Sequence, residues 1–198
     1  MLNPLLVTLF SCGVLVTTSL PLSAQHNCPT SLKVNSVVQH DWHYATDAIG
    51  SSVQTKSQLI NDDHIWIQFS RVPRLNAKSN SWVELIYDLP NKSLAAVATI
   101  ALEYKSSTGL VVKLSQQDYG GLGDKSYAHY QHKLAPADNW TTRCFTLDDF
   151  SRPSWTPVES IDVGMILEHI NAIYLVPDLT DEHGGTATIS VKSLTLLP

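Results

Sequence analysis

His64-Ile-Trp-Ile-Gln-Phe-Ser70 carries the clearest strand pattern in the sequence. Ile65, Ile67 and Phe69 alternate with His64, Trp66, Gln68 and Ser70, and successive side chains of a β-strand point to opposite faces. The alternation predicts a strand with one face in a hydrophobic core and the other toward solvent.

Similar short stretches recur every ten or so residues, separated by Gly, Pro, Asn and Asp. Leu32, Val34, Ser36 and Val38 alternate with polar neighbours and predict an early strand. Further strands are expected at residues 82–87, 97–104, 110–115, 127–133, 140–147, 170–176 and 186–197. The one segment with helical spacing, 158–168, contains Gly164, so we expect a loop with a short strand or turn there.

About ten strands without a convincing helix predict an all-β protein. With no helices to cover sheet faces, two antiparallel sheets must pack on each other, as a β-sandwich or jelly roll. The sequence contains no internal repeat, low-complexity tract or linker. Residues 25–198 are therefore predicted to form a single domain.

Residues 1–24 contain no charged residue and carry an apolar run rich in Leu, Val, Phe and Thr. This pattern predicts a secretory signal peptide cleaved after Ala24, too short and too rich in Thr and Ser for a membrane span. It lacks the basic residue with which a signal normally begins. The alternative is a lipoprotein modified at Cys12. The expected location is secreted or periplasmic, with no transmembrane segment after cleavage.

All 13 Lys and Arg and all 18 Asp and Glu residues lie after the predicted signal, so the net charge of −5 belongs to the domain. The charges form no runs and no basic patch. A nucleic acid or an anionic membrane is therefore not an expected partner.

Signal cleavage would leave two cysteines, Cys28 and Cys144. In an oxidising compartment such a pair predicts a disulfide, here between the N-terminal segment and a strand. Closing so long a loop is worth about 4–5 kcal/mol in the chain-entropy model. Two buried free thiols are the alternative, because spacing alone does not establish contact.

The usual catalytic motifs are absent from the sequence. There is no Gly-x-Ser-x-Gly elbow or His-Glu-x-x-His helix, and Gly120-Gly-Leu-Gly123 lacks the ending of a phosphate-binding loop. The adjacent carboxylates Asp62-Asp63 and Asp148-Asp149 stand beside turn signals, which favours a turn or capping role over paired acid/base chemistry.

The sequence also gives little sign of a metal or cofactor site. His129 and His132 are three residues apart on a predicted strand, which places them on opposite faces and prevents one metal from binding both. No organic cofactor is expected. A structural calcium held by loop carboxylates and carbonyls would suit such a sandwich, although no Asp-rich loop identifies it.

Aromatic and polar residues are concentrated in the predicted loops. A flat ring packs against the apolar face of a pyranose, while amides, carboxylates and Lys bind the hydroxyls. The alternative is that these aromatic residues cap the ends of the core. The rings concerned are Trp42, Tyr44, Tyr119, Tyr127, Tyr130 and Trp155.

The order of several motifs resembles a known family. Trp140-Thr-Thr-Arg-Cys-Phe-Thr-Leu-Asp-Asp-Phe150, then Pro153-Ser-Trp155 and a final strand from Ala187, are similar to galactose-binding-like jelly rolls. Such domains occur as carbohydrate-binding modules of bacterial polysaccharide-degrading systems and in the complex I intermediate-associated protein family. The resemblance covers residues 81–196 and touches residues 42–52. Val191-Lys-Ser193 replaces the Asp-Asn-Ile often seen in the last strand, which puts a family-type calcium in doubt.

The resemblance implies an exported, non-catalytic protein that binds a poly- or oligosaccharide. Lys113 is included in the expected site because Leu110, Val112 and Leu114 take the core side of its strand. The expected contacts are Trp42, Tyr44, Lys113, Gln116, Asp118, Tyr119, Tyr127, Tyr130 and Trp155. The alternatives are an assembly protein that binds another exported protein, and a polysaccharide-active enzyme using Tyr127, His129 and Lys113.

Overall fold

The computed structural model describes residue 28 and residues 35–39, 41–76 and 79–198. The predicted signal peptide, the alternative lipidation at Cys12 and residues 29–34 of the N-terminal segment lie outside the described residues. No helix in the described part of the chain is long and apolar enough to cross a membrane.

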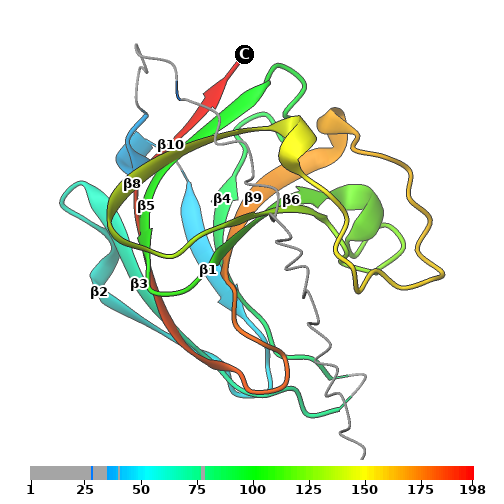
Figure 1. The fold of residues 1–198 in the computed structure, drawn as a ribbon, viewed down its shortest axis with the longest axis horizontal. Coiled ribbons are helices and arrows are strands. Elements are labelled where there is room, and N and C mark those ends of the chain that lie inside the picture. Colours follow the sequence, from blue (N-terminus) through cyan, green and yellow to red (C-terminus); the bar gives the residue numbers. More distant parts are fainter. Residues whose placement is uncertain (1–27, 29–34, 40, 77–78) are drawn as a thin grey trace, which may run out of the picture.

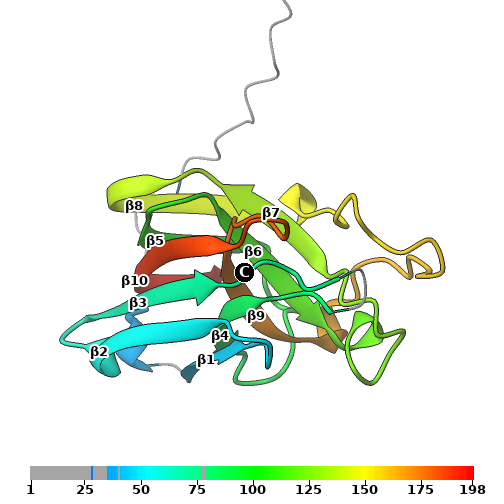
Figure 2. The same ribbon diagram turned by 90° about the horizontal axis from the view of Figure 1, so that it is seen from below.

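Two five-stranded antiparallel sheets make up the fold (Figures 1 and 2). The first, sheet I, has the order β1 (Trp42–Thr46), β4 (Val83–Asp88), β9 (Ile170–Pro177), β6 (Leu110–Gln116) and β7 (Tyr130–Leu134). The second, sheet II, has the order β2 (Ser52–Asn61), β3 (His64–Arg71), β10 (Gly185–Leu197), β5 (Thr99–Ser106) and β8 (Ala137–Thr146). The predicted all-β sandwich is confirmed.

Short 3-10 turns are the helical elements of the described chain: η1 (Val37–Gln39), η2 (Gln117–Tyr119), η3 (Leu147–Asp149) and η4 (Leu167–His169). The segment with helical spacing is a loop that ends in η4, as predicted. This segment is part of the long connection between η3 and β9. Residues 151–166 of that connection are here called the 151–166 loop.

The core lies between the two sheets and follows the predicted alternation. Ile65, Ile67 and Phe69 of β3 are fully buried, and so are Leu110 and Leu114 of β6. Burying one such side chain contributes roughly 1.5–3 kcal/mol. The strands therefore hold their register, because a slip by one residue would expose every core side chain.

Three parts of the strand prediction need correction. β1 and β2 were not expected, and Trp42 and Tyr44 therefore lie on a strand rather than in a loop. β2 is a mostly exposed edge strand, so no buried alternation marks it in the sequence. Of the expected strand at residues 32–38, the described part is a bridge from Ser36 to Ser193 followed by η1.

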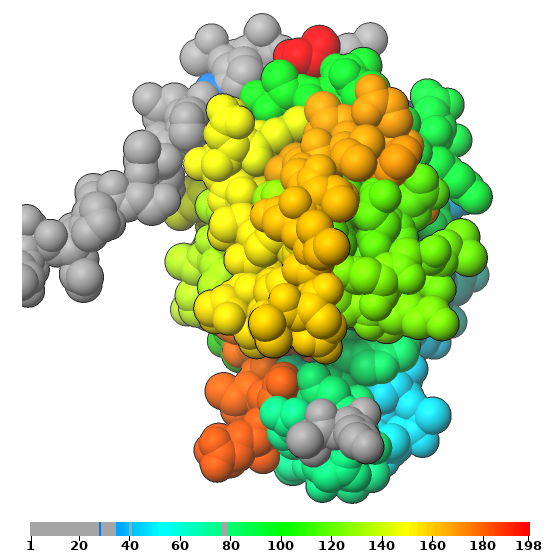
Figure 3. All heavy atoms as spheres, turned by 90° about the vertical axis from the view of Figure 1, so that its right-hand side faces the viewer, coloured from blue at the N-terminus to red at the C-terminus, as the bar shows by residue number. Residues whose placement is uncertain are grey.

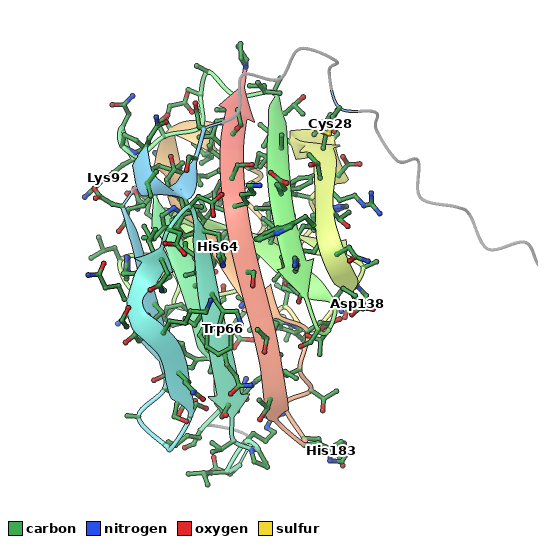
Figure 4. All side chains as sticks on the ribbon, turned by 90° about the vertical axis from the view of Figure 1, so that its left-hand side faces the viewer. Cys28, His64, Trp66, Lys92, Asp138 and His183 are labelled. Atoms are coloured by element: carbon green, nitrogen blue, oxygen red, sulfur yellow. A yellow bond between two sulfur atoms is a disulfide. The ribbon has the colours of Figure 1, made fainter. Side chains whose placement is uncertain are left out.

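The disulfide between Cys28 and Cys144 is present, with the two Cα atoms 5.2 Å apart. Cys144 lies near the end of β8, an edge strand of sheet II, and Figure 4 shows Cys28 beside that end of the strand. The bond therefore joins the segment before β1 to an edge strand of sheet II.

The adjacent carboxylates serve turns, as predicted. Asp62 has a φ of 55° at the turn from β2 to β3. The Asp149 carboxylate accepts hydrogen bonds from the backbone and hydroxyl of Thr146, at 2.7 and 3.1 Å, and caps η3.

Candidate functional site

The outer face of sheet I, here called the sheet I face, is built by residues that alternate with core residues. Ile86 of β4, Tyr174 of β9 and Lys113 of β6 stand opposite one another in the strand register and form one row across three strands. Their neighbours along the strands, such as Leu85 and Leu175, are fully buried in the core. The row therefore points away from the core.

The floor of the sheet I face is made of small or branched apolar side chains. Ile86, Val111, Ala172 and Val176 all have this orientation, yet each is almost fully buried. Larger neighbours shield them from solvent. A ligand on this face would therefore meet an apolar floor with polar and aromatic groups around it, as in many small-molecule sites.

A depression of about 170 Å³ lies where the sheet I face meets the loop after β6. Ser115 and Tyr174 line it from the sheet, and Tyr127, His129 and Asn171 line it beside them. The remaining lining comes from residues 116–122. Figure 3 shows this loop next to the 151–166 loop, and a hydrogen bond from Ser160 to Asp124 joins the two.

Tyr127 is the most exposed ring of the depression, at 57%. Its φ is 53°, in the left-handed region that non-glycine residues rarely adopt, and its N–H donates to the Tyr119 carbonyl at 2.8 Å. Such a conformation costs of order 1–3 kcal/mol and persists where the surroundings impose it. The loop thus holds Tyr127 in place although its ring is exposed.

His129 lies between the two tyrosine rings of the site. Its ring meets those of Tyr127 and Tyr174 edge-on, with centroids 6.4 and 6.1 Å away. The Gln116 N–H donates to His129 Nδ1 at 3.2 Å, so the neutral imidazole carries its proton on Nε2. Burial lowers the pKa of His129 to about 4, and the charge of Lys113 acts in the same direction.

The depressed pKa of His129 predicts acid sensitivity of the fold. Its folded-state pKa lies below the unfolded value of 6.5, so the unfolded chain binds the proton more tightly. The stabilisation that the protein gains from keeping His129 neutral is fully present above pH 6.5 and is lost as the pH falls toward 4. Between pH 7 and 4.5 the wild type should lose about 2–3 kcal/mol more than His129→Gln. Urea unfolding of both proteins at the two pH values measures this, and equal losses would contradict it.

The charges of the sheet I face are balanced. Lys113 Nζ lies 3.4 Å from Glu84 Oε1, and both side chains are mostly buried. The Ser115 hydroxyl donates to the Tyr174 hydroxyl oxygen at 2.8 Å. Burial raises the pKa of Tyr174, which therefore keeps its proton at neutral pH. The site offers neutral hydrogen-bonding groups and one compensated ion pair.

The structure places only some of the predicted contacts here. Lys113 points outward from β6, as predicted, and Tyr127 lines the depression. Gln116 also lines it, but its side chain is buried and engaged: Nε2 donates to Asp118 and to the Gly164 carbonyl, and Oε1 accepts from Ile166. Gln116 fixes the loops rather than a ligand.

Tyr119 and Tyr130 must be corrected for a related reason. Tyr119 is 1% exposed, and Arg152 covers its ring with the guanidinium carbon 3.8 Å from the centroid. The hydroxyls of both tyrosines donate to Asp162, at 3.1 and 2.8 Å. Burial, followed by the Asp162 carboxylate, raises the pKa of Tyr130 to about 12. Both rings anchor the 151–166 loop, and the Tyr119 ring is covered.

The remaining predicted contacts lie apart from the depression. Asp118 binds His169 at 2.9 Å and Gln116, which holds η2 against η4. Trp42 packs on the core residue Tyr87 at 5.1 Å, and Tyr44 is half-exposed on the same edge strand. Trp155 is 56% exposed in the 151–166 loop. None of the three rings lines the depression.

Tyr174, Ser115, Glu84 and Asn171 were missed in the sequence. The signal for Tyr174 was present, because it alternates with Ile173 and Leu175 inside a predicted strand and must therefore face outward. What the sequence could not show is that β9 lies between β4 and β6, which brings Tyr174 beside Glu84 and Lys113.

The two histidines of β7 and its approach point to opposite sides, as predicted. His132 stacks on the core residue Phe145 with centroids 5.1 Å apart, whereas His129 faces the depression. Within the described residues, no three His, Cys, Asp or Glu side chains gather as a metal site. A structural calcium stays a prediction.

Comparison with solved structures relates this fold to known ones. A family 11 carbohydrate-binding module from Clostridium thermocellum, solved with a β-1,3-1,4-mixed-linked tetrasaccharide, has a TM-score of 0.55 and 15% identity, covering 79% of this chain and 88% of the module. The family 11 module of the cellulosomal cellulase Lic26A-Cel5E of the same organism has a TM-score of 0.55 and 14% identity, covering 85% and 96%. This chain has the jelly-roll fold of a carbohydrate-binding module.

The predicted resemblance to jelly-roll modules is thus confirmed at the level of the fold. At 14–15% identity the similarity concerns the fold alone. The sequence matches no protein-family model and no curated protein. The function of this jelly roll must therefore be argued from its own surface.

Proposed function

We propose that this protein is an exported, non-catalytic carbohydrate-binding protein that holds a poly- or oligosaccharide chain on the sheet I face. The observation that carries the proposal is the pair of rings Tyr127 and Tyr174 at one depression, with Tyr127 held at a positive φ. Aromatic rings fixed in a polar surface suit the apolar faces and hydroxyls of sugars.

The shape of the site favours a chain over a small ligand. The depression of about 170 Å³ is smaller than the roughly 300–1,000 Å³ of sites that enclose a drug-sized molecule. Ser115, Lys113 and Glu84 continue from it along the sheet and supply donors and acceptors for further sugar units. The mixed-linked tetrasaccharide held by the structurally similar module makes β-glucans the first ligands to test.

The contacts of the candidate catalytic groups support a binding role. In the described part of the chain, Tyr127, His129 and Lys113 form no hydrogen bond with one another. Lys113 is paired with Glu84, and His129 accepts a hydrogen bond from a backbone amide. Two of the three groups are thus already engaged within the protein, which suits a binding role.

The Cys28–Cys144 disulfide supports export, because such bonds persist in oxidising compartments. Expression with the native N-terminus, followed by mass determination of the mature protein, tests this part of the proposal. The expected mass is that of a chain that begins at Gln25. A protein that retains residues 1–24 in the cytoplasm would contradict it.

Two matched aromatic substitutions test the binding site. Tyr127 and Trp155 are almost equally exposed, at 57% and 56%, but only Tyr127 lines the depression. Tyr127→Ala should weaken binding about tenfold, as expected for one stacked ring at a site of few contacts. Trp155→Ala should leave binding unchanged.

Affinity gels and calorimetry against plant, algal and bacterial polysaccharides, including mixed-linked β-glucan, measure these effects. Loss of binding in Trp155→Ala but not in Tyr127→Ala would move the site to the 151–166 loop. Absence of binding to every glycan, with a folded sample, would refute the proposed function.

A further inference from the structure

The outer face of sheet II, here called the sheet II face, carries a second group of aromatic and polar side chains. Ile65, Ile67 and Phe69 of β3 enter the core, so His64, Trp66 and Gln68 point to the opposite side. Figure 4 shows His64 and Trp66 on β3 of this face. The two faces lie on opposite sides of the sandwich (Figure 2).

The strand register places Trp66 in a row of small and polar residues. Trp66 stands opposite Ser190 of β10, and Ser190 stands opposite Lys105 of β5. One step along the strands, Gln68 stands opposite Thr188 on one side and Gln54 on the other. On the β10 side, Trp66 is therefore bordered by hydroxyl and amide groups.

A second indole closes this row at the other edge of the sheet. The Trp140 ring of β8 lies 4.9 Å from Lys105 Nζ and 5.8 Å from Lys192 Nζ, measured to its centroid. The His64 ring meets it edge-on at 5.6 Å. Side chains from three other strands thus fix Trp140 across the face.

Trp66 differs from Trp140 because its ring has no comparable partner. In the described part of the chain, Trp66 makes no ring, cation or side-chain hydrogen-bond contact, although it is half-buried on the sheet. A rigid strand therefore presents an indole that is partly open to solvent and that no described ring or cation covers. Large rings are normally buried or engaged, so this one is suited to a ligand.

The charges of the sheet II face indicate a neutral ligand. Lys192 Nζ lies 4.0 Å from Asp63, which also pairs with His64 at 3.1 Å, and the outward residues of β5 are Glu103 and Lys105. Lys192 and Lys105 thus share the face with two carboxylates, Asp63 and Glu103. Such a surface would attract neither a polyanion nor an anionic membrane.

We infer that the sheet II face is a second binding site for a neutral glycan, with Trp66 as its stacking platform. A pyranose on Trp66 would place its hydroxyls within the hydroxyl and amide border of Ser190, Thr188 and Gln68. The inference rests on the proposed function for the class of ligand, but on different residues. With one site on each side of the sandwich, a single molecule holds two glycan chains and bridges them.

Calorimetric stoichiometry tests the second site. The first probe is the mixed-linked tetrasaccharide. If a different polysaccharide retards the protein in affinity gels, a short oligosaccharide of that polysaccharide takes its place. The wild type should bind two oligosaccharides per chain. Trp66→Ala should bind one, with the affinity of the remaining site unchanged, and Tyr127→Ala should weaken only the other site.

Matched variants make the result decisive. Trp66→Thr keeps a residue that favours strands and should also lose one site, which separates loss of the ring from loss of the fold. Trp155→Ala should keep both sites, and the double variant of Trp66 and Tyr127 should lose the sheet II site and bind about tenfold more weakly at the sheet I site.

The outcomes separate the two proposals. A single wild-type site that Trp66→Ala leaves intact, or two sites retained in both Trp66 variants, overturns the second site and leaves the sheet I site standing. Loss of a site with Trp66→Ala and no effect of Tyr127→Ala supports the second site and refutes the first. Absence of any binding overturns both.

Discussion

Cys28→Ala, Cys144→Ala and the double variant should each unfold with about 4–5 kcal/mol less free energy than the oxidised wild type. The bond closes a loop across 116 positions of sequence separation, and its removal returns that loop's conformational freedom to the unfolded chain. A loss of this size approaches the whole stability of many domains.

Urea unfolding with and without reductant measures the effect. The three variants should be similar to one another and to the reduced wild type, because each removes the same bond. A double variant much less stable than either single one would show that the cysteines act through packing. An oxidised wild type no more stable than the reduced protein would contradict the prediction.

Gly123→Ala should destabilise the protein by about 3 kcal/mol and weaken glycan binding more than tenfold. An added Cβ at Gly123 would overlap the Asp118 carbonyl, which accepts a hydrogen bond from Asp124 at 2.9 Å. Backbone cannot move aside as a flexible side chain can. The loop that holds Tyr127 at its positive φ would have to open.

Gly120→Ala is the matched control for this substitution. It adds the same methyl group to the same loop, but its Cβ would lie 3.7 Å from the nearest atom, the Gln117 carbonyl, which is ordinary contact. Gly120→Ala should keep the free energy of unfolding close to that of the wild type. Chemical unfolding and calorimetry with the same glycan compare the two variants, and equal behaviour would show that the close contact at Gly123 is unimportant.

Local sequence patterns predicted most of the fold. The alternation in β3, and the similar runs in seven later strands, follow from the two-residue repeat of a strand that is half-buried. Where that condition fails, the prediction fails too. β2 is an edge strand with little burial, and Ser36 and Val38 precede or enter a turn instead of a strand.

The candidate site was predictable in part. The core residues that alternate with Lys113 predicted its place on the outer side of the strand. Tyr127 was predicted as a ligand contact from its residue type and its place after a glycine turn. Tyr119 was wrong as a contact, because neither residue type nor spacing reveals that Arg152 and Asp162 cover it. These partners come from a loop 33 and 43 positions further along the chain.

Local patterns were enough to predict the all-β class, the core side of most strands and the pair of cysteines able to form the disulfide. Which outward side chains share a face follows from the order of the strands in each sheet. Strand order brings β9 between β4 and β6, and β10 between β3 and β5, so that Tyr174 meets Lys113 and Trp66 meets Ser190. Strand alternation is a local property of the backbone, whereas neighbourhood across a sheet depends on contacts between residues far apart in the chain.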